Sequence, residues 1–276
     1  MIPESTTITL KVMSFNVKRD TFRFGRHVWS KRASLVAATI RENTPDIIGT
    51  QELTENTLGD LQRLLPEYAY VGKGRGGGNK GEYSAIFYRK DKFSLLQENT
   101  FWLSHNPQVP SRGRLAFFPR ICTWCELCPT QAPEKTLRVY NTHLDHISYF
   151  ARVQGLKLIC SRIIERYEKA PGAVIFMGDF NATPNSKTLR KWAETGVHTQ
   201  SGIVLEDSYN MLLKPDREKA LVGCSYHGFR GRIGGHPIDY IFTSKDIVLR
   251  DVSIHRGGEQ KAYPSDHYPV IAEVEL

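Results

Sequence analysis

The order of short apolar segments along the chain constrains the fold more than any other feature of the sequence. Segments of strand length occur at 8–16, 46–50, 68–71, 83–88, 93–103, 121–127, 137–143, 173–177, 239–243, 248–254 and 267–274. Helical spacing of apolar residues occurs at 31–42, 54–65 and 148–169, and a further helix is expected after Pro184. Strands therefore outnumber helices, and helices separate only some of them. This order predicts an α/β fold in which two sheets are flanked by helices.

Nothing in the sequence divides this series into two domains. No repeat, low-complexity tract or linker interrupts it, so we expect a single domain over residues 1–276. The composition, with 40% hydrophobic and 24% charged residues, excludes a disordered, fibrous or disulfide-scaffold protein. No apolar stretch approaches the roughly 18 residues of a membrane span, and the N-terminus lacks the pattern of a signal peptide. Unless a leader precedes this sequence, we expect a soluble cytoplasmic protein with no membrane contact and no obligate protein partner.

Two spacings resemble cofactor motifs but fail when their context is considered. Cys122, Cys125 and Cys128 are spaced like part of an iron–sulfur run, yet no fourth cysteine is near and strand alternation separates Cys125 from the other two. Five cysteines in apolar segments of a large chain favour reduced thiols. The pattern Gly72-x-Gly74-x-x-Gly77 matches a dinucleotide fingerprint by letter, but no helix pattern follows it. We interpret it as part of a mobile loop.

The chain is moderately basic, and its positive charge is concentrated in two blocks. It has 37 Lys and Arg residues against 29 Asp and Glu residues, which gives a net charge of +8. One block comprises Lys18, Arg19, Arg23, Arg26, Lys31 and Arg32, and the other comprises Lys73, Arg75, Lys80, Arg89, Lys90 and Lys92. Such blocks suit a polyanionic or phosphorylated substrate. A solvated surface with counterions would explain them equally well.

Polar residues that can bind a hard cation stand at the ends of several predicted strands. These residues are Asn16, Glu52, Asp179, Asn181 and Asp266. Ligands collect at the ends of sheet strands in α/β folds, so we expect these side chains to converge on one site. They offer oxygen atoms and no thiolate, which suits Mg²⁺ or Mn²⁺ rather than structural Zn²⁺.

Two histidines stand at comparable strand ends. His143 and His267 could polarise or protonate phosphate oxygens from these positions. Asp239 is the candidate carboxylate for orienting His267 and fixing its ring tautomer. Each of these short signals also has a purely structural explanation as a turn or a helix start, so their joint occurrence in this order carries the argument.

Taken in order, these motifs resemble the endonuclease/exonuclease/phosphatase superfamily. The matching pieces are SFNV at 14–17, QE at 51–52, NTHLDH at 141–146, GDFN at 178–181, IDYIF at 238–242 and SDH at 265–267, and they span nearly the whole chain. The resemblance implies a four-layer α/β sandwich with two mixed β-sheets packed face to face, flanked by helices, and one active site at the ends of the sheets. It also implies a phosphoesterase that depends on Mg²⁺ or Mn²⁺.

The resemblance assigns roles to individual residues. Asn16 and Glu52 match the first metal-binding pair, and Asp266 matches a second carboxylate near the metal. Asp179 and Asn181 match the residues that activate the attacking water and hold the phosphate. The remaining assignments are a His–Asp pair of His267 and Asp239, a position beside the scissile phosphate for His143, a carboxylate that orients this histidine at Glu82, and a phosphate contact at Arg120.

The substrate is open at this level. Our first hypothesis is a phosphodiesterase that acts on nucleic acid by metal-assisted in-line attack of water, because basic blocks accompany the complete set of site residues. The second is a phosphomonoesterase for a small sugar or nucleotide phosphate, and the third is a catalytically inactive binding module. The runs NTHLDH, FWLS at 101–104 and SYHGF at 225–229 resemble a bacterial branch without one defined substrate. Aromatic side chains that could stack a base or sugar ring, or else belong to the core, are Trp29, Trp102, Tyr83 and Phe229.

Overall fold

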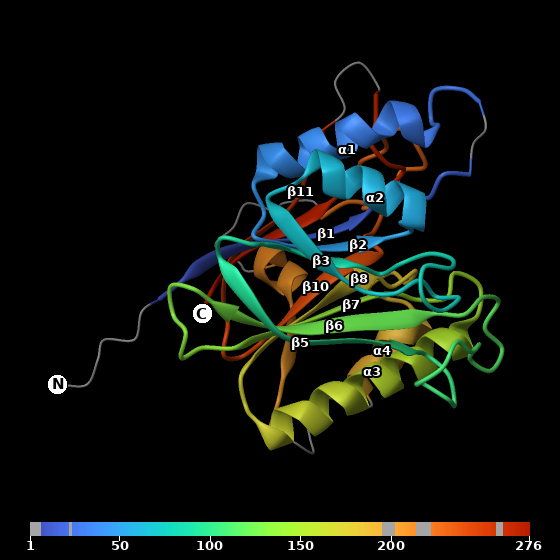
Figure 1. Ribbon diagram of the computed structural model, residues 1–276. Coiled ribbons are helices and arrows are strands. Elements are labelled where there is room, and N and C mark those ends of the chain that lie inside the picture. Colours follow the sequence, from blue (N-terminus) through green and yellow to red (C-terminus); the bar gives the residue numbers. More distant parts are fainter. Residues whose placement is uncertain (1–6, 22–23, 195–201, 214–221, 258–261) are drawn as a thin grey trace.

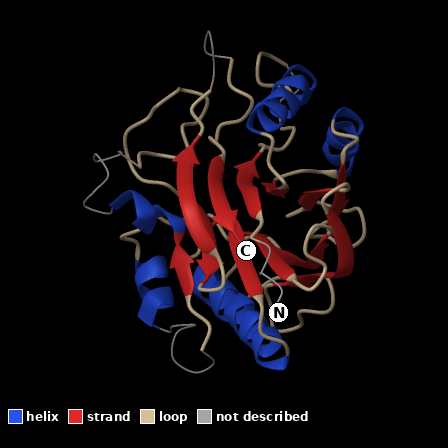
Figure 2. Ribbon diagram, turned by 90° about the vertical axis from the view of Figure 1, so that its left-hand side faces the viewer, coloured by secondary structure: helices blue, strands red, loops and turns tan. Residues whose placement is uncertain are grey.

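Two six-stranded sheets pack face to face in a computed structural model of the chain (Figures 1 and 2). The structure describes residues 7–21, 24–194, 202–213, 222–257 and 262–276. The first sheet contains, in spatial order, β11 (Val248–Ile254), β12 (Val270–Glu275), β1 (Thr9–Asn16), β2 (Ile47–Gln51), β4 (Ile86–Arg89) and β3 (Tyr68–Val71). The second contains β5 (Phe93–Trp102), β6 (Ile121–Pro129), β7 (Leu137–His143), β8 (Ala173–Asp179), β10 (Asp239–Ser244) and β9 (Leu205–Asp207).

Helices cover the outer face of each sheet. The first sheet carries α1 (Trp29–Asn43) and α2 (Glu55–Leu64), and the second carries α3 (Tyr149–Lys169) and α4 (Lys187–Glu194), as Figure 1 shows. The apolar stripes that predicted these helices face inward, with Ile40 of α1 and Ile159 of α3 fully buried. The four-layer α/β sandwich expected from the sequence is thereby confirmed. No described helix is long and apolar enough to cross a membrane.

Strand register brings the polar strand ends together within each sheet. Strands β7 and β8 are parallel and place His143 beside Asp179, while the antiparallel strand β10 places Asp239 on the other side of Asp179. In the first sheet, β1 and β2 are parallel and pair Asn16 with Gln51. Parallel neighbours end at the same edge of a sheet, so these residues collect at one end of the sandwich.

A buried polar bridge joins the two sheets close to that end. Asn141 of β7 donates from Nδ2 to the carbonyl oxygens of Thr50 and Ala85, at 2.9 Å each. Its Oδ1 accepts a hydrogen bond from Gln51 Nε2 at 2.8 Å. Gly49 leaves room for this bridge, because a Cβ there would lie 2.9 Å from the Asn141 side chain. The bridge therefore fixes how the strand ends of one sheet face those of the other.

Most predicted elements occur within a few residues of their expected bounds. Strand β4 begins at Ile86 rather than at Tyr83, because Tyr83 forms isolated bridges with Leu53 and Gly74. The last strand begins at Val270, three positions later than expected. Strand β9 and the 3₁₀ helix η1 (Ser208–Leu213) were not predicted, since such short elements carry no periodic signal.

The cysteines are all free thiols. Cys122 and Cys125 are buried in β6, and burial raises the pKa of both thiols. Protonated, buried thiols are poor metal ligands.

Candidate active site

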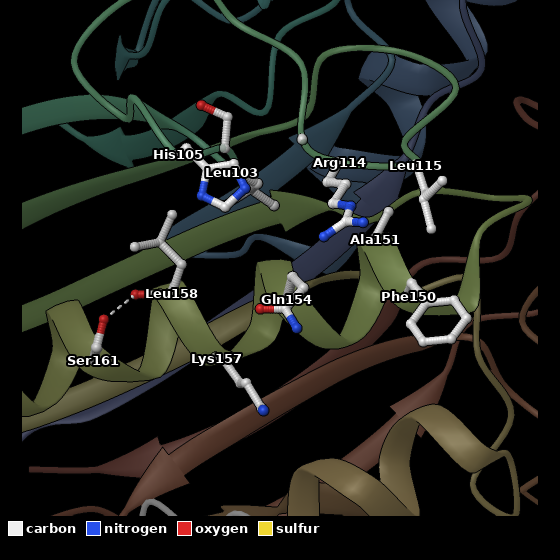
Figure 3. Close-up of a pocket in the computed structure, with 12 residues that line it drawn as sticks. Leu103, His105, Arg114, Leu115, Phe150, Ala151, Gln154, Lys157, Leu158 and Ser161 are labelled. Atoms are coloured by element: carbon white, nitrogen blue, oxygen red, sulfur yellow. Dashed lines mark hydrogen bonds between the residues drawn. The ribbon is translucent and has the colours of Figure 1, made fainter.

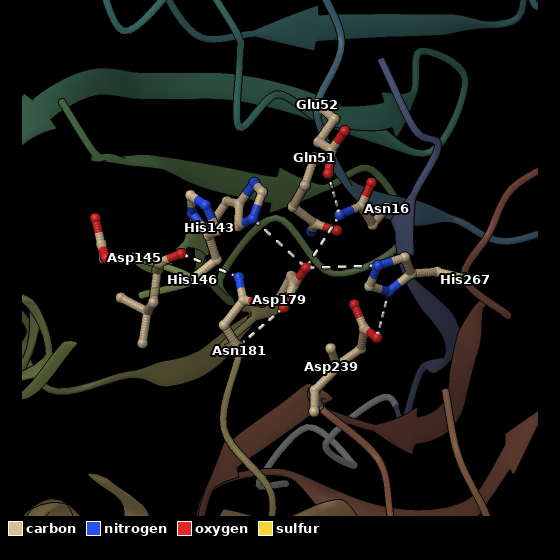
Figure 4. Close-up of polar contacts among 12 residues, drawn as sticks. Asn16, Gln51, Glu52, His143, Asp145, His146, Asp179, Asn181, Asp239 and His267 are labelled. Atoms are coloured by element: carbon tan, nitrogen blue, oxygen red, sulfur yellow. Dashed lines mark hydrogen bonds and ion pairs between the residues drawn. The ribbon is translucent and has the colours of Figure 1, made fainter. Parts of the chain in front are cut away.

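A pocket of about 280 Å³ lies where the strand ends of the two sheets meet. Its lining includes these residues expected from the sequence: Glu52, Glu82, Arg120, His143, Asp179, Asn181, Asp266 and His267. Asn16 and Asp239 are fully buried and hydrogen-bond to residues of the lining (Figure 4). The fold thus brings all of the expected site residues to one place.

Asp179 lies at the centre of this group. Its Oδ2 is 3.0 Å from Asn16 Nδ2, 3.5 Å from His143 Nε2 and 3.8 Å from His267 Nε2 (Figure 4). Burial, and next the neighbouring Asp239 carboxylate, raise the pKa of Asp179 to about 7, against the opposing effect of His267. A carboxylate with a pKa near neutrality is suited to accept a proton from water.

His267 and Asp239 form a buried ion pair. His267 Nδ1 lies 2.9 Å from Asp239 Oδ2, and both residues are at most 5% exposed. Burial alone would lower the pKa of His267, but the Asp239 carboxylate raises it to about 10. The carboxylate therefore fixes the ring orientation and favours an imidazolium whose Nε2–H faces Asp179.

The structure corrects the expected partner of His143. Glu82 was expected to orient this histidine, but its carboxylate instead pairs with Arg19 and Arg75, each at 2.9 Å. Burial and the nearby Arg120 guanidinium hold the pKa of His143 well below its usual range. His143 Nε2 lies 3.5 Å from Asp179 Oδ2, so a neutral ring with its proton on Nε2 would present a donor to this carboxylate.

Glu52 and Asp266 converge on one cationic group. The Lys18 ammonium lies 3.7 Å from Glu52 Oε2 and 3.3 Å from Asp266 Oδ2. Burial would raise the pKa of Glu52, but Lys18 and the hydrogen bond from the Arg19 backbone N–H lower it. Glu52 therefore stays ionised, and both carboxylates present hard oxygen atoms to a shared cation position.

The Asn16 side chain is hydrogen-bonded through both its oxygen and its nitrogen. Its amide oxygen accepts the Lys18 backbone N–H at 3.0 Å. Its amide nitrogen donates to Glu52 Oε1 at 3.1 Å and to Asp179 Oδ2 at 3.0 Å. Asn16 therefore orients Glu52 and Asp179, and its binding of a metal stays a prediction.

A second group satisfies the distances for metal binding. Ligand atoms of Asp179, Asp239 and His267 all lie within 4.8 Å of one another. The hydrogen bond between His267 Nδ1 and Asp239 Oδ2 already occupies two of the atoms that could bind a metal. Glu52 and Asp266 are for this reason the better candidate metal ligands.

Three residues of the site adopt left-handed backbone conformations. The φ angles are 57° at Lys18, 67° at Glu52 and 48° at Asn181. Non-glycine residues in this region are uncommon, and each costs of order 1–3 kcal/mol unless its surroundings compensate. Backbone strain of this kind clusters at functional sites. Glu52, a proposed metal ligand, and Asn181, a proposed phosphate contact, both line the pocket.

Arg120 is the least compensated charge of the site. It is 6% exposed, and its side chain makes one hydrogen bond to a described residue, from Nη2 to His146 Nδ1 at 3.1 Å. Its Nε is buried without a partner. No ion pair links it to a carboxylate in the part of the chain that the structure describes, whereas Arg75 pairs with Glu82. Burial lowers the pKa of Arg120, and the Glu82, Asp179 and Asp145 carboxylates offset this only in part. An anion bound in the pocket would therefore stabilise the guanidinium.

The basic blocks of the sequence do not form one surface. Arg32 is 1% exposed and donates to the carbonyl oxygens of Val17, Lys18, His27 and Pro264, which is a structural role. Arg89 ends β4 and pairs with Asp91, while Lys92 pairs with Asp46, and neither lines the pocket. Arg23 lies outside the described residues. Only three members of the blocks line the pocket, namely Lys18, Arg19 and Arg75.

The aromatic side chains at the pocket are not the ones singled out from the sequence. Trp29, Trp102 and Tyr83 are buried in the core, and Phe229 stacks on His27. Phe118, His146 and Tyr226 line the pocket instead. Phe118 and Tyr226 come from irregular loops, where no periodic pattern predicts a position in the site, although Tyr226 belongs to the run SYHGF noted in the sequence. His146 had a signal, because the run NTHLDH continues past His143.

A larger cavity lies elsewhere. It measures about 740 Å³ and lies between α3 and the segment that follows β5 (Figure 3). Leu103, Leu115, Phe150 and Leu158 contribute to its lining, and no carboxylate does. Without an acid–base pair this cavity is not suited to hydrolysis, and size alone does not identify the active site.

Comparison with known proteins places the chain in a family. The model of the endonuclease/exonuclease/phosphatase family matches residues 13–267. The chain belongs to this family, whose members are hydrolases of phosphoric esters.

Two similar solved structures cover nearly the whole chain. A mannosyl-6-phosphatase from Bacteroides thetaiotaomicron is 33% identical, with a TM-score of 0.85 over 96% of this chain and 99% of that protein. An endonuclease/exonuclease/phosphatase family protein from the same organism is 32% identical, with a TM-score of 0.87 over 99% of this chain and 96% of the other. Among curated proteins, human 2',5'-phosphodiesterase 12 is 23% identical over 96% of this chain and 51% of its own length. The chain thus spans about half the length of the curated relatives it matches.

Proposed function

We propose that this protein is a metal-dependent phosphomonoesterase that removes phosphate from a small compound such as a sugar phosphate. The observation that carries the proposal is the buried Arg120 guanidinium, which faces the pocket and pairs with no carboxylate among the described residues. Arg75 and His143 line the same pocket. Guanidinium groups match the geometry and charge of a phosphate dianion.

The site residues divide the chemistry among them. Asp179 is the proposed general base, because its pKa of about 7 lets it take a proton from water at neutral pH. His267, held by Asp239 at 2.9 Å, donates from Nε2 to a phosphate oxygen as negative charge develops. Arg120 and Asn181 hold the phosphate while water attacks it.

Glu52 and Asp266 are the residues that would hold the divalent cation. Their fit to a metal rests on the way both carboxylates already face one cationic group, the Lys18 ammonium. Bound Mg²⁺ or Mn²⁺ would supply Lewis-acid stabilisation of charge on the phosphate oxygens. The identity of the ion is part of the proposal, and oxygen ligands favour these two ions.

The size of the pocket and the spread of charge support a small monoester over a polymer. A cavity of about 280 Å³ is at the lower limit of ordinary ligand pockets. A nucleic acid would require a track of cations beyond it, but Arg32, Arg89 and Lys92 are engaged elsewhere. The 33% identical relative named as a mannosyl-6-phosphatase supports the same order of preference. The second hypothesis from the sequence therefore moves ahead of the first.

A phosphodiesterase acting on nucleic acid is the second candidate. Phe118 and the 43% exposed Tyr226 line the pocket, where they could stack a base. The curated relatives named 2',5'-phosphodiesterase 12 support this candidate, although the chain spans about half of their length.

Turnover on matched substrates separates the two candidates. We would measure kcat/KM with Mg²⁺ or Mn²⁺ on a hexose 6-phosphate, a 5'-nucleotide, a 2',5'-linked oligoadenylate and a single-stranded oligonucleotide. We expect the monoesters to have the higher kcat/KM, with little dependence on salt. Arg120→Ala should abolish this preference, and Arg114→Ala, which replaces an exposed arginine outside the pocket, is the matched control. Faster cleavage of either oligonucleotide, with a steep decrease in salt, would establish the second candidate and reject the first.

A further inference from the structure

We propose that His146 is a positioning residue that holds the Arg120 guanidinium toward the phosphate position of the pocket. The inference rests on the proposed function, in which Arg120 contacts phosphate. It also gives a role to the residues that follow His143 in the run NTHLDH, which the catalytic assignments leave unused.

The hydrogen bond between the two side chains has only one possible direction. Arg120 Nη2 lies 3.1 Å from His146 Nδ1. A guanidinium has donors and no acceptor, so Nδ1 must accept and the ring must be neutral, with its proton on Nε2. This is the one side-chain hydrogen bond that Arg120 makes within the described chain. Its remaining donors are therefore free for an anion.

Packing holds the His146 ring in the orientation that this bond requires. The ring stacks on Phe118 at 6.1 Å between centroids with an interplanar angle of 16°, and Phe117 meets it edge-on at 6.2 Å. The Arg75 guanidinium lies over the Phe118 ring, 4.8 Å from its centroid. One wall of the pocket is thus a chain of contacts that runs from Arg75 through Phe118 and His146 to Arg120.

Asp145 anchors both segments that build this wall. Its carboxylate is buried, and its Oδ2 accepts the Phe117 backbone N–H at 2.9 Å. Its Oδ1 accepts the N–H groups of Ile147 at 2.9 Å and Ser148 at 2.7 Å. The same side chain therefore fixes the loop that carries His146 and the segment that leads into Arg120. Without this anchoring, the exposed side chain of His146 could adopt several orientations.

Protonation of His146 should release Arg120. A proton on Nδ1 removes the acceptor and places two cations in contact. Partial burial and the Arg120 guanidinium lower the pKa of His146, while Asp145 and Glu82 act in the opposite direction and Arg75 adds to the lowering. The ring consequently stays neutral at physiological pH, and phosphate affinity should decrease only under acidic conditions.

The test combines single and double variants of the two residues. We would measure KM and kcat on a hexose 6-phosphate and the inhibition constant of inorganic phosphate for His146→Ala, His146→Gln, Arg120→Ala and the double variant His146→Ala/Arg120→Ala. His105→Ala is the control, because it removes an exposed histidine that does not line this pocket. Thermal unfolding would confirm that each variant is folded.

We expect His146→Ala to raise KM and the phosphate inhibition constant about tenfold, which corresponds to loss of one hydrogen bond to a charged group. Glutamine offers an acceptor that does not titrate, so His146→Gln should recover most of this affinity and lose its acid dependence. In the Arg120→Ala background, His146→Ala should cost almost nothing. Equal losses with and without Arg120, or an unchanged inhibition constant in His146→Ala, would overturn the inference. If the wild type hydrolyses no monoester, the proposed function fails, and phosphate binding still decides the role of His146.

Discussion

Replacing His227 should remove much of the acid sensitivity of the fold. This histidine follows Tyr226 in the chain and is fully buried, and its ring stacks on Tyr268 at 3.9 Å between centroids. Its Nδ1 accepts the Gly231 N–H at 3.3 Å, so Nε2 carries the ring proton, and Nε2 has no hydrogen-bond partner. A second proton, on Nδ1, would therefore replace the acceptor of the Gly231 N–H in the native state.

The magnitude follows from the change in pKa between the unfolded and folded states. Burial, followed by the charge of His267, lowers the pKa of His227 from 6.5 to about 4. Below pH 6.5, His227 binds a proton in the unfolded chain but stays neutral in the native state. The stability that the neutral ring contributes is complete above pH 6.5 and decreases as the pH falls toward 4. A difference of roughly 2.5 units corresponds to about 3 kcal/mol in total, of which about 2 kcal/mol is lost by pH 5.

Urea unfolding at pH 8, 7, 6 and 5, with EDTA present throughout, measures this loss. Wild type should lose about 2 kcal/mol more than His227→Gln between pH 8 and pH 5, because the other histidines titrate alike in both proteins. The control His105→Gln, at an exposed position, should follow wild type. Identical pH dependence in wild type and His227→Gln would refute the reasoning, because it would mean that the native state accommodates the charged ring.

Three further predictions concern the site and the junction of the sheets. Asp179→Asn should lower kcat on the best substrate by at least about 10²-fold with little change in KM, and a wild-type rate would reject its role as base. Excess EDTA should abolish turnover, Mg²⁺ or Mn²⁺ should restore it, and Glu52→Gln should weaken the response of thermal stability to added metal; full activity in EDTA would reject the metal site. Gly49→Ala should destabilise the fold by about 1–3 kcal/mol, because the new Cβ would lie 2.8 Å from Met177 Sδ, and wild-type stability in urea unfolding would show that the sheets can separate locally.

The sequence alone determined the fold class and the location of the candidate site. Apolar periodicity identified most strands and the helices α1, α2 and α3, because each buries one face, and α4 lies where a helix was expected after Pro184. Polar residues at strand ends predicted a common site, since parallel strands such as β7 and β8 must end at the same edge. The element bounds that differ are those set by tertiary contacts, such as the bridges of Tyr83.

Tertiary structure alone decided which side chains are partners and which charges remain for a ligand. Asn16 and Asp179 are separated by 163 residues, and only the packed sheets show that the amide donates to the carboxylate. In the same way, Glu82 pairs with arginines rather than with His143. Arg32 and Arg120 look alike in the sequence, yet four backbone carbonyls satisfy the first and one histidine holds the second. Local patterns determine secondary structure, because they act over a few residues. The pairing of charges depends on distances between segments far apart in the chain, which only the folded molecule sets.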